Sequence, residues 1–166
     1  MQRTSKLLLA VLVVAVTGCA QTGGGAPAAS SGTPAAASNK IPPGMNANGE
    51  VVDASKVEGG FGTKVKGIND TEGEITGKPA PSSKFTQLKI GMGMKQVTDL
   101  VGPPTDQGTY ITGKAFIPFY FGGDRHRFEM AYKGQGRLVF AGGGMGDYNS
   151  GNLIWIIYSA SESGYR

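Results

Sequence analysis

The sequence predicts an α+β fold in which two short N-terminal helices pack on a three- to four-stranded antiparallel sheet, after a long flexible tether. Three observations support this prediction. Of the seven Phe, six Tyr and one Trp residues, only Phe61 precedes position 83. Two short stretches with helical periodicity follow residue 82, and stretches of strand type follow them. The compact part of the chain is therefore expected over residues 82–166.

Two short helices open this part of the chain. Ser82 or Ser83 can cap a helix that runs through Leu88, and Gly91 supplies the left-handed residue that ends it. A second helix is expected from Met94 to Val101, because apolar residues recur there on one face and a Gly-Pro-Pro sequence follows. Neither helix is long enough to be stable alone, so each needs a sheet to pack on.

Four further segments supply the sheet. Residues 128–132 alternate apolar and polar, and after a tight Gly-containing connection residues 137–141 return as the second arm of a hairpin. Residues 153–158 are apolar on both faces, which is typical of a central strand. A further strand is expected within residues 110–123, where Pro118 favours an edge or a bulge. Apolar neighbours on both sides place Trp155 in the core.

The first residues of the chain resemble a secretory leader. Arg3 and Lys6 precede ten apolar residues, 7–16, and small residues then lead to Cys19, the single cysteine. Ten residues are too few for a spanning helix, which needs about 20. An ordinary secretory leader is cut after a small-x-small pattern, and Cys19 would then have no role in processing. The sequence Val-Thr-Gly-Cys at 16–19, however, resembles the lipobox of bacterial lipoproteins, so residues 1–18 are interpreted as a lipoprotein signal peptide.

The lipobox resemblance implies that the chain is cut before Cys19, whose sulfur receives a diacylglycerol and whose new N-terminus is acylated. One acyl chain holds a protein only marginally, at about 0.8 kcal/mol per buried methylene, whereas two or three make anchoring effectively permanent. Ala20 and Gln21 follow the cysteine, without the aspartate that retains many lipoproteins at the inner membrane. An outer-membrane location is therefore expected, and no thiol remains for a disulfide.

Residues 19–81 are interpreted as the lipidated N-terminus and a tether. Residues 20–50 are mostly Ala, Gly, Pro, Ser, Thr and Asn, which bury too little apolar surface to offset the entropy of ordering. A flexible chain over 20–81 would reach about 40–47 Å. Within it, residues 61–77 could form a small hairpin around a turn-rich centre or remain a plain linker, and the pattern leaves both open.

The stretch "LKIGMGMKQVTDLVGPP" at 88–104 resembles the helix–helix signature of the SmpA/OmlA domain, also called the BamE-like domain. A "GRLV" hairpin arm at 136–139 adds to the resemblance, which covers residues 83–166. The matching positions are Leu88, Ile90, Gly91, Met92, Val97, Leu100, Gly102 and Pro104. This pattern indicates a fold more directly than it indicates a binding partner.

The resemblance implies a function as well as a fold. Small BamE-like lipoproteins lie on the periplasmic side of the outer membrane and support the machinery that inserts β-barrel proteins. They contact its lipoprotein and barrel subunits and, in some cases, anionic phospholipid, and they have no catalytic activity. The same α/β unit is also seen in small secreted inhibitors of β-lactamase. A tethered periplasmic binding module of inhibitor-like fold, acting on a soluble enzyme or the cell wall, is therefore the alternative.

The composition favours binding over catalysis. The one histidine, His126, lies between Arg125 and Arg127, and no second histidine exists for a base or metal cluster. No catalytic residue, metal site or cofactor is therefore expected. Removing Arg3 and Lys6 with the leader leaves 14 basic residues against 12 acidic ones, which is not the basic footprint of a nucleic-acid-binding protein.

The best candidate for partner or phospholipid contact is the segment 116–127. It combines aromatic residues with arginines, which together favour a protein hot spot or a lipid head-group site. The simpler interpretation is that most of these aromatic residues belong to the core and the arginines to a solvated strand end. Alternation still favours at least one exposed aromatic residue. The candidate residues are Phe116, Phe119, Tyr120, Phe121, Arg125 and Arg127.

Overall fold

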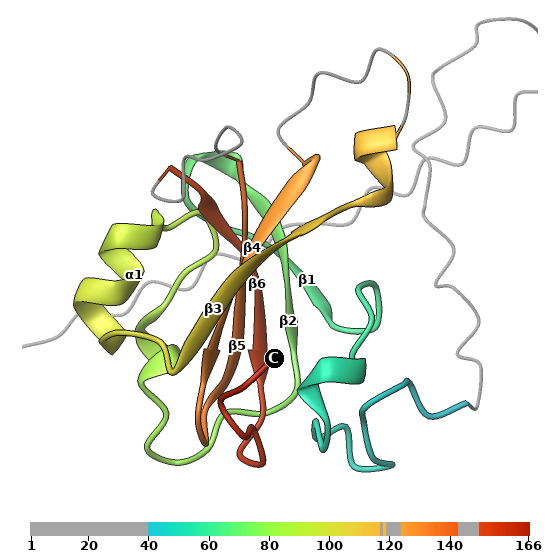
Figure 1. The fold of residues 1–166 in the computed structure, drawn as a ribbon. Coiled ribbons are helices and arrows are strands. Elements are labelled where there is room, and N and C mark those ends of the chain that lie inside the picture. Colours follow the sequence, from blue (N-terminus) through green and yellow to red (C-terminus); the bar gives the residue numbers. More distant parts are fainter. Residues whose placement is uncertain (1–39, 117, 119–123, 143–149) are drawn as a thin grey trace, which may run out of the picture. The chain divides into compact units, whose positions relative to one another are not determined.

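The structure is a computed structural model that describes residues 40–116, 118, 124–142 and 150–166, all within one unit, Ser38–Arg166. Six strands and one α-helix form its framework (Figure 1). The strands are β1 (Thr63–Lys66), β2 (Glu72–Thr76), β3 (Asp106–Ile111), β4 (His126–Tyr132), β5 (Gly136–Ala141) and β6 (Asn152–Tyr158). The helix is α1 (Met94–Val101), and 3₁₀ turns occur at η1 (Ala54–Lys56), η2 (Ile68–Asp70), η3 (Lys84–Gln87) and η4 (Gly113–Phe116).

The six strands form one mixed sheet in the order β1-β2-β6-β5-β4-β3. The β2–β6 pair is parallel, with Ile75 opposite Ile156, and the other pairs are antiparallel. The predicted fold class is therefore wrong in two respects. The sheet has six strands of mixed direction rather than three or four antiparallel ones, and only one of the two predicted helices is an α-helix. The first ends after one 3₁₀ turn, capped by the Ser83 hydroxyl.

The tether predicted over residues 20–81 is wrong for residues 40–81. The hairpin within 61–77, left open by the sequence, forms as β1 and β2 and joins the sheet through β6. Residues upstream of it contribute Val51 and Ala54 to a buried cluster against Trp155. Polar composition misled the prediction because each strand of this hairpin packs only one partly buried apolar side chain, Val65 or Ile75, against the helix-side core. The rest of the predicted tether lies outside the described residues.

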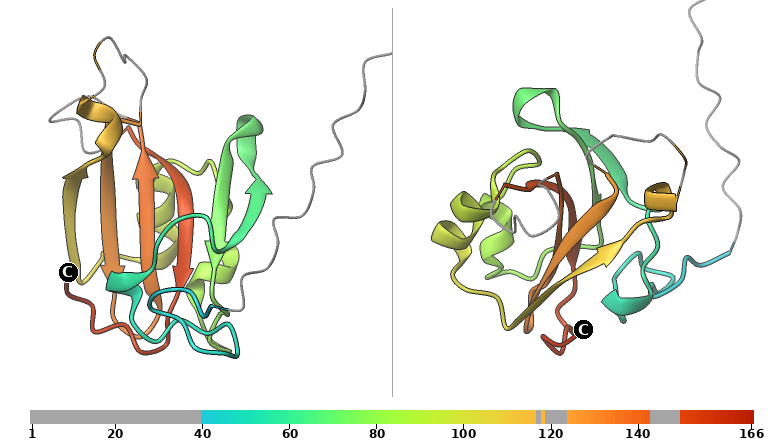
Figure 2. Two further views of the ribbon diagram at one scale, coloured as in Figure 1. Left: turned by 90° about the vertical axis from the view of Figure 1, so that its right-hand side faces the viewer. Right: turned by 45° about the horizontal axis from the view of Figure 1, so that its top comes forward.

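One face of the sheet, which we call the helix face, is covered by η3 and α1 (Figure 2). Its core includes Phe85 of η3, Val97 of α1 and Phe140 of β5, each with 0% exposed surface. Two buried tyrosines connect the layers by hydrogen bonds. The Tyr132 hydroxyl donates to the Gly102 carbonyl over 3.1 Å, and the Tyr158 hydroxyl donates to the Phe85 carbonyl over 3.3 Å. Burial raises the pKa of Tyr132 to about 12, which keeps this donor protonated.

Packing explains most apolar residues of the 88–104 motif, although Leu100 is 40% exposed. Leu88, Ile90, Met92 and Val97 are buried on the helix face. Gly91 has a φ of +90°, and a Cβ there would lie 2.5 Å from the Ile68 carbonyl oxygen. The Gly91 backbone N–H donates to the Leu153 carbonyl over 2.7 Å. The α-helix predicted from Met94 to Val101 is confirmed with those bounds, and Gly102 ends it with a φ of +93°.

The other face, which we call the open face, carries Trp155, Ile157 and Val139. Its buried end includes an ion network from three elements. The Arg137 guanidinium donates to Glu162 and to Glu129, each over 2.7 Å, and to the Tyr165 carbonyl over 3.0 Å. These contacts hold the C-terminal residues against β4 and β5. Burial opposes the Arg137 charge, but the two carboxylates outweigh it and raise the pKa of the guanidinium.

The C-terminal strands follow the sequence closely. The hairpin of 128–132 and 137–141 is confirmed as β4 and β5, and the central strand expected at 153–158 is β6, between β2 and β5. Trp155 is buried, as predicted. The strand expected within 110–123 is displaced: β3 begins at Asp106 and ends at Ile111, and η4 follows it. It is an edge strand, as Pro118 suggested, although Pro118 lies outside it.

Candidate functional site

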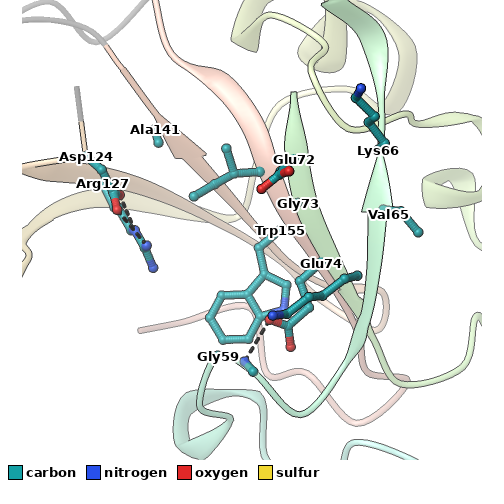
Figure 3. A pocket seen from close by; sticks show the side chains of 13 residues that line it. Gly59, Val65, Lys66, Glu72, Gly73, Glu74, Asp124, Arg127, Ala141 and Trp155 are labelled. Carbon is teal, nitrogen blue, oxygen red and sulfur yellow. Dashed lines mark hydrogen bonds and ion pairs between the residues drawn. The ribbon is translucent and has the colours of Figure 1, made fainter. Parts of the chain in front are cut away.

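The open face contains a groove of about 1030 Å³ between the β1–β2 hairpin and the residues around the start of β4 (Figure 3). The sheet twists between these two walls, so its central strands form the floor. The floor is apolar and consists of Ala141, Ile154 and Trp155. The walls are charged. Lys64 of β1 lines the groove. Lys66 and Glu72 also belong to the hairpin, and Asp124 and Arg127 lie across the floor from them.

A bulge explains why the floor is continuous. Val139 pairs with Trp155 but the next residue, Phe140, pairs with Leu153, so β6 has one extra residue at Ile154. Strict alternation would place Ile154 on the helix face. The bulge instead lets it pack with the open-face cluster beside Trp155, while Leu153 is fully buried in the helix-face core. Two adjacent large apolar residues thereby face the same groove.

A chain of hydrogen bonds fixes the hairpin wall to this floor. The Trp155 indole N–H donates to the Thr76 hydroxyl over 2.9 Å, and that hydroxyl donates to Glu74 over 3.2 Å. Glu74 also accepts the backbone N–H groups of Gly60 and Gly62, over 2.7 and 2.6 Å. Its carboxylate is thus engaged from two sides. We infer that Glu74 orders the loop at the mouth of the groove.

The opposite wall is built on Asp124. Its carboxylate accepts from Arg127 over 2.9 and 3.2 Å and pairs with Lys114. Burial opposes ionisation of Asp124, but the bonds from Arg127 and Lys114 outweigh it and lower the pKa. Burial also raises the pKa of Tyr110, and a hydrogen bond with Arg127 partly offsets this effect. Arg127 therefore presents a guanidinium that is already oriented by two neighbours.

The hairpin wall carries side chains of both charges, and two of them are available to pair with a ligand. Cross-strand register places Lys64 opposite Glu74 and Lys66 opposite Glu72. Among the described residues, neither Lys64 nor Glu72 has an ion-pair or side-chain hydrogen-bond partner, and Lys66 pairs with the largely exposed Asp70. An occupant of the groove would meet an apolar floor, a free ammonium and a free carboxylate. This combination suits a polypeptide surface better than a small anion.

The structure brings together only part of the site predicted from the sequence. Arg127 lies in the groove wall, and Phe116 is 79% exposed in η4, which contradicts a core position for that side chain. Arg125 is exposed on the approach to β4. Phe119, Tyr120, Phe121 and Cys19 lie outside the described residues. The prediction of at least one exposed aromatic residue in the segment is confirmed by Phe116.

The sequence prediction missed the hairpin wall. Lys64, Lys66, Glu72 and Glu74 lie in the segment that the sequence left open between a hairpin and a linker, and their common face was not considered. One signal could have revealed it. "KVK" and "EGEI" alternate with period two, and opposite charges at matched positions are typical of an antiparallel pair. Trp155 was correctly placed as buried, but its contact with a groove depended on pairing β6 with β2.

No protein-family model, curated protein or solved structure matches the chain. Over the described ranges, no group of three or more His, Cys, Asp or Glu side chains is arranged to hold a metal ion. Within the same ranges, no helix is long and apolar enough to cross a membrane. The groove is therefore interpreted from its own residues.

Proposed function

We propose that the chain is a non-catalytic outer-membrane lipoprotein, anchored through Cys19 on the periplasmic side, that acts by binding in outer-membrane protein assembly or envelope integrity. The observation that carries the binding function is the groove on the open face. It combines an apolar floor with walls of both charges, on a sheet whose opposite face packs its central strands against η3 and α1. Catalysis is not proposed, because the chain offers one histidine and one cysteine, and the cysteine is assigned to the lipid.

The extent of the folded unit favours action close to the membrane. A tether over residues 20–81 would have reached about 40–47 Å, which suited a module that acts on distant soluble targets. With residues 40–81 in the folded unit, the sequence leaves 20–39 for a tether, and a flexible chain of that length reaches about 22–27 Å. This shorter reach supports the membrane-proximal function over the tethered inhibitor-like module.

The proposed partner is a protein subunit of the barrel-assembly machinery, as the SmpA/OmlA resemblance implies. The groove suits a protein surface that carries an apolar anchor flanked by one acidic and one basic side chain, opposite Lys64 and Glu72 respectively. Anionic phospholipid is a second proposed contact, near Phe116 and Arg125. Arg127 is less suited to bind phosphate, because Asp124 already accepts two of its hydrogen bonds.

Anchoring is tested by the intact mass of the native protein purified from a bacterial envelope. The expected mass is that of residues 19–166 plus two or three acyl chains and glycerol. A Cys19→Ala chain should keep its leader or be released from the membrane fraction. A native protein with an unmodified thiol at position 19 would refute the anchoring proposal, whatever the groove binds.

The groove is tested by placing a photoreactive phenylalanine derivative at position 64 and irradiating intact cells. The matched control places it at Lys95, whose side chain is 81% exposed on α1 beneath the opposite face of the sheet. We expect a discrete adduct from position 64, identified by mass spectrometry as a barrel-assembly subunit, and none from position 95. Adducts with a soluble enzyme would favour the alternative function, and equal labelling from both positions would remove the groove from the proposal.

A further inference from the structure

The two edges of the sheet differ in how well they are protected against pairing with another strand. β1 is four residues long and carries Lys64 and Lys66, and short edge strands with lysines resist edge-to-edge association. β3 is six residues long, has the sequence Asp-Gln-Gly-Thr-Tyr-Ile, and contains neither lysine nor proline. Its one charged residue, Asp106, already pairs with Arg166 over 3.3 Å. β3 therefore has the features of an edge that is open to pairing.

Backbone geometry shows which groups this edge offers. The Thr112 N–H donates to the Arg125 carbonyl over 2.9 Å, immediately beyond the β3–β4 ladder. Residues in an antiparallel pair alternate between those bonded to the neighbouring strand and those directed away from it. Counting back from Thr112, Gly108 and Tyr110 bond toward β4. Gln107, Thr109 and Ile111 therefore direct their N–H and carbonyl groups away from the sheet, where the described residues provide no strand to receive them.

Exposed apolar surface is concentrated beside the same edge. Tyr110 is 37% exposed, Ile111 is 57% exposed, and Phe116 in the following η4 is 79% exposed. Figure 1 shows β3 at the edge of the sheet, leading into η4. Tyr110 and Ile111 lie on opposite faces of the sheet, so a strand paired to this edge would contact an exposed apolar side chain on each face.

We propose that β3 is the dimerisation edge of this protein, and that it pairs antiparallel with β3 of a second copy about a two-fold axis at Thr109. A two-fold axis perpendicular to the sheet keeps each side chain on its own face of the sheet. Residues directly opposite each other in an antiparallel pair share a face, so the axis must pass between one residue and the same residue of the other copy. Centring on Thr109 places Gly108 opposite Tyr110 of the other copy, and Gln107 opposite Ile111. The occupant is thus a second copy of this chain.

Self-complementarity is the reason for choosing a second copy over another strand. Gly108 and Tyr110 both lie on the open face, as their partners Glu129 and Arg127 do. In the proposed register each tyrosine ring approaches the glycine of the other copy, which has no side chain of its own to exclude it. The Arg166 guanidinium occupies the space above Gly108, and a Cβ there would lie 2.0 Å from its Nη1. It offers the incoming ring a cation–π contact.

The equivalent pairing through β1 is unfavourable. An antiparallel β1 pair centred on Val65 would place Lys64 opposite Lys66 of the other copy at both ends of the strand, on the same face. Like charges directly opposite each other destabilise a strand pair. In the β3 register, by contrast, Asp106 lies opposite Thr112, and no two like charges face each other. The chemistry of the two edges therefore selects β3 for self-association.

The test uses cysteine cross-linking of the mature chain with Cys19→Ser, so that it does not depend on lipid anchoring. In the proposed register, position 109 faces its own counterpart as a hydrogen-bonded pair with a Cα separation of about 5.5 Å, within the 4.4–6.8 Å range of disulfides. We expect Thr109→Cys to form a disulfide-linked dimer under mild oxidation. Gln107→Cys lies on the same face and edge but should not form this disulfide. Position 107 of one copy lies opposite position 111 of the other, so the two introduced cysteines are about four residues apart along the strand.

The register is checked further by mixing two variants. Gln107→Cys mixed with Ile111→Cys should give the 107–111 heterodimer, which mass spectrometry identifies. No dimer from Thr109→Cys, or equal amounts from Thr109→Cys and Gln107→Cys alone, would overturn the proposal. A Thr109→Pro chain removes an outward N–H without removing a bond to β4, so it should keep its circular dichroism spectrum and sediment as a monomer. A Thr109→Pro chain that folds and still dimerises would also overturn it.

Discussion

The two faces of the sheet are stabilised by different kinds of interaction. The helix face is one apolar cluster that extends from Phe85 through α1 to Tyr158, and its few polar groups are tyrosine hydroxyls bonded to backbone carbonyls. The open face has a smaller apolar cluster, a buried ion network around Arg137 and a groove with charged walls. The helix face therefore contributes most of the stability, and the open face retains the charged groups that line the groove.

The largest effect is expected from Phe140→Ala on the helix face. Phe140 is fully buried between β4 and β6, and its truncation removes apolar burial and leaves a cavity. The free energy of unfolding should fall by about 3–5 kcal/mol. Urea denaturation followed by near-ultraviolet circular dichroism measures this loss.

Leu100→Ala is the matched control on the same side of the sheet. Leu100 belongs to the 88–104 motif but is 40% exposed on α1, so its truncation should cost about 1 kcal/mol or less. A loss below about 1 kcal/mol for Phe140→Ala as well would contradict the assignment of stability to the helix face.

A loss of about 3 kcal/mol is expected from Arg137→Met on the open face, for a different physical reason. The side chain of Glu162 is only 2% exposed and that of Glu129 is 17% exposed, so removing the guanidinium leaves a buried carboxylate without its counter-charge. Breaking a buried pair costs about 3–5 kcal/mol, and the partial exposure of Glu129 places the effect at the lower end.

Rescue distinguishes a charge penalty from a cavity penalty. Adding Glu162→Gln to Arg137→Met removes the isolated charge and should recover more than half of the lost free energy of unfolding, because an uncharged amide is less costly to bury. The same second substitution should not rescue Phe140→Ala. If Glu162→Gln further destabilises the Arg137→Met chain, the loss comes from packing, and the contrast between the faces is weaker than we infer.

The helix face was largely predictable from the sequence. Its apolar residues recur with helical spacing in α1 and with period two in β4, so each element could be recognised locally. Gly91 and Gly102 marked turns that only positive φ values permit. The exception was η3, where the same capping signal led to one 3₁₀ turn rather than an α-helix. Four residues of pattern do not distinguish these outcomes.

The open face was not predictable because its pattern is polar and its contacts are distant. β1 and β2 contribute only Val65 and Ile75 to the helix-face core, so their composition resembles that of a linker. The pairing that orders them joins Ile75 to Ile156, 81 positions away, and parallel pairing has no local turn signal. The groove follows from this pairing. Hence the sequence alone could single out Arg127 as a candidate but could not place Lys64 or Glu72 across the groove from it.

The smallest effect is expected from Asp124→Asn in the groove wall, and it should depend on pH. Burial opposes the Asp124 charge, but Arg127 and Lys114 lower its pKa below the ordinary aspartate value. A carboxyl group with a lowered folded-state pKa stabilises the fold above its unfolded pKa, and that contribution is lost as the pH falls through the folded value. The free energies of unfolding of the two chains should therefore differ at neutral pH, by about 0.5–1 kcal/mol.

This difference should begin to shrink near pH 4, the ordinary aspartate value, and should vanish at lower pH, because protonation of Asp124 then removes the same ion pairs that the substitution removes. Chemical denaturation of both chains at several pH values measures it. Phe140→Ala provides the comparison, since the cost of a cavity has no such titration and should persist across the same range. A constant offset for Asp124→Asn would mean that Asp124 supports the groove wall through hydrogen-bond geometry rather than through its charge.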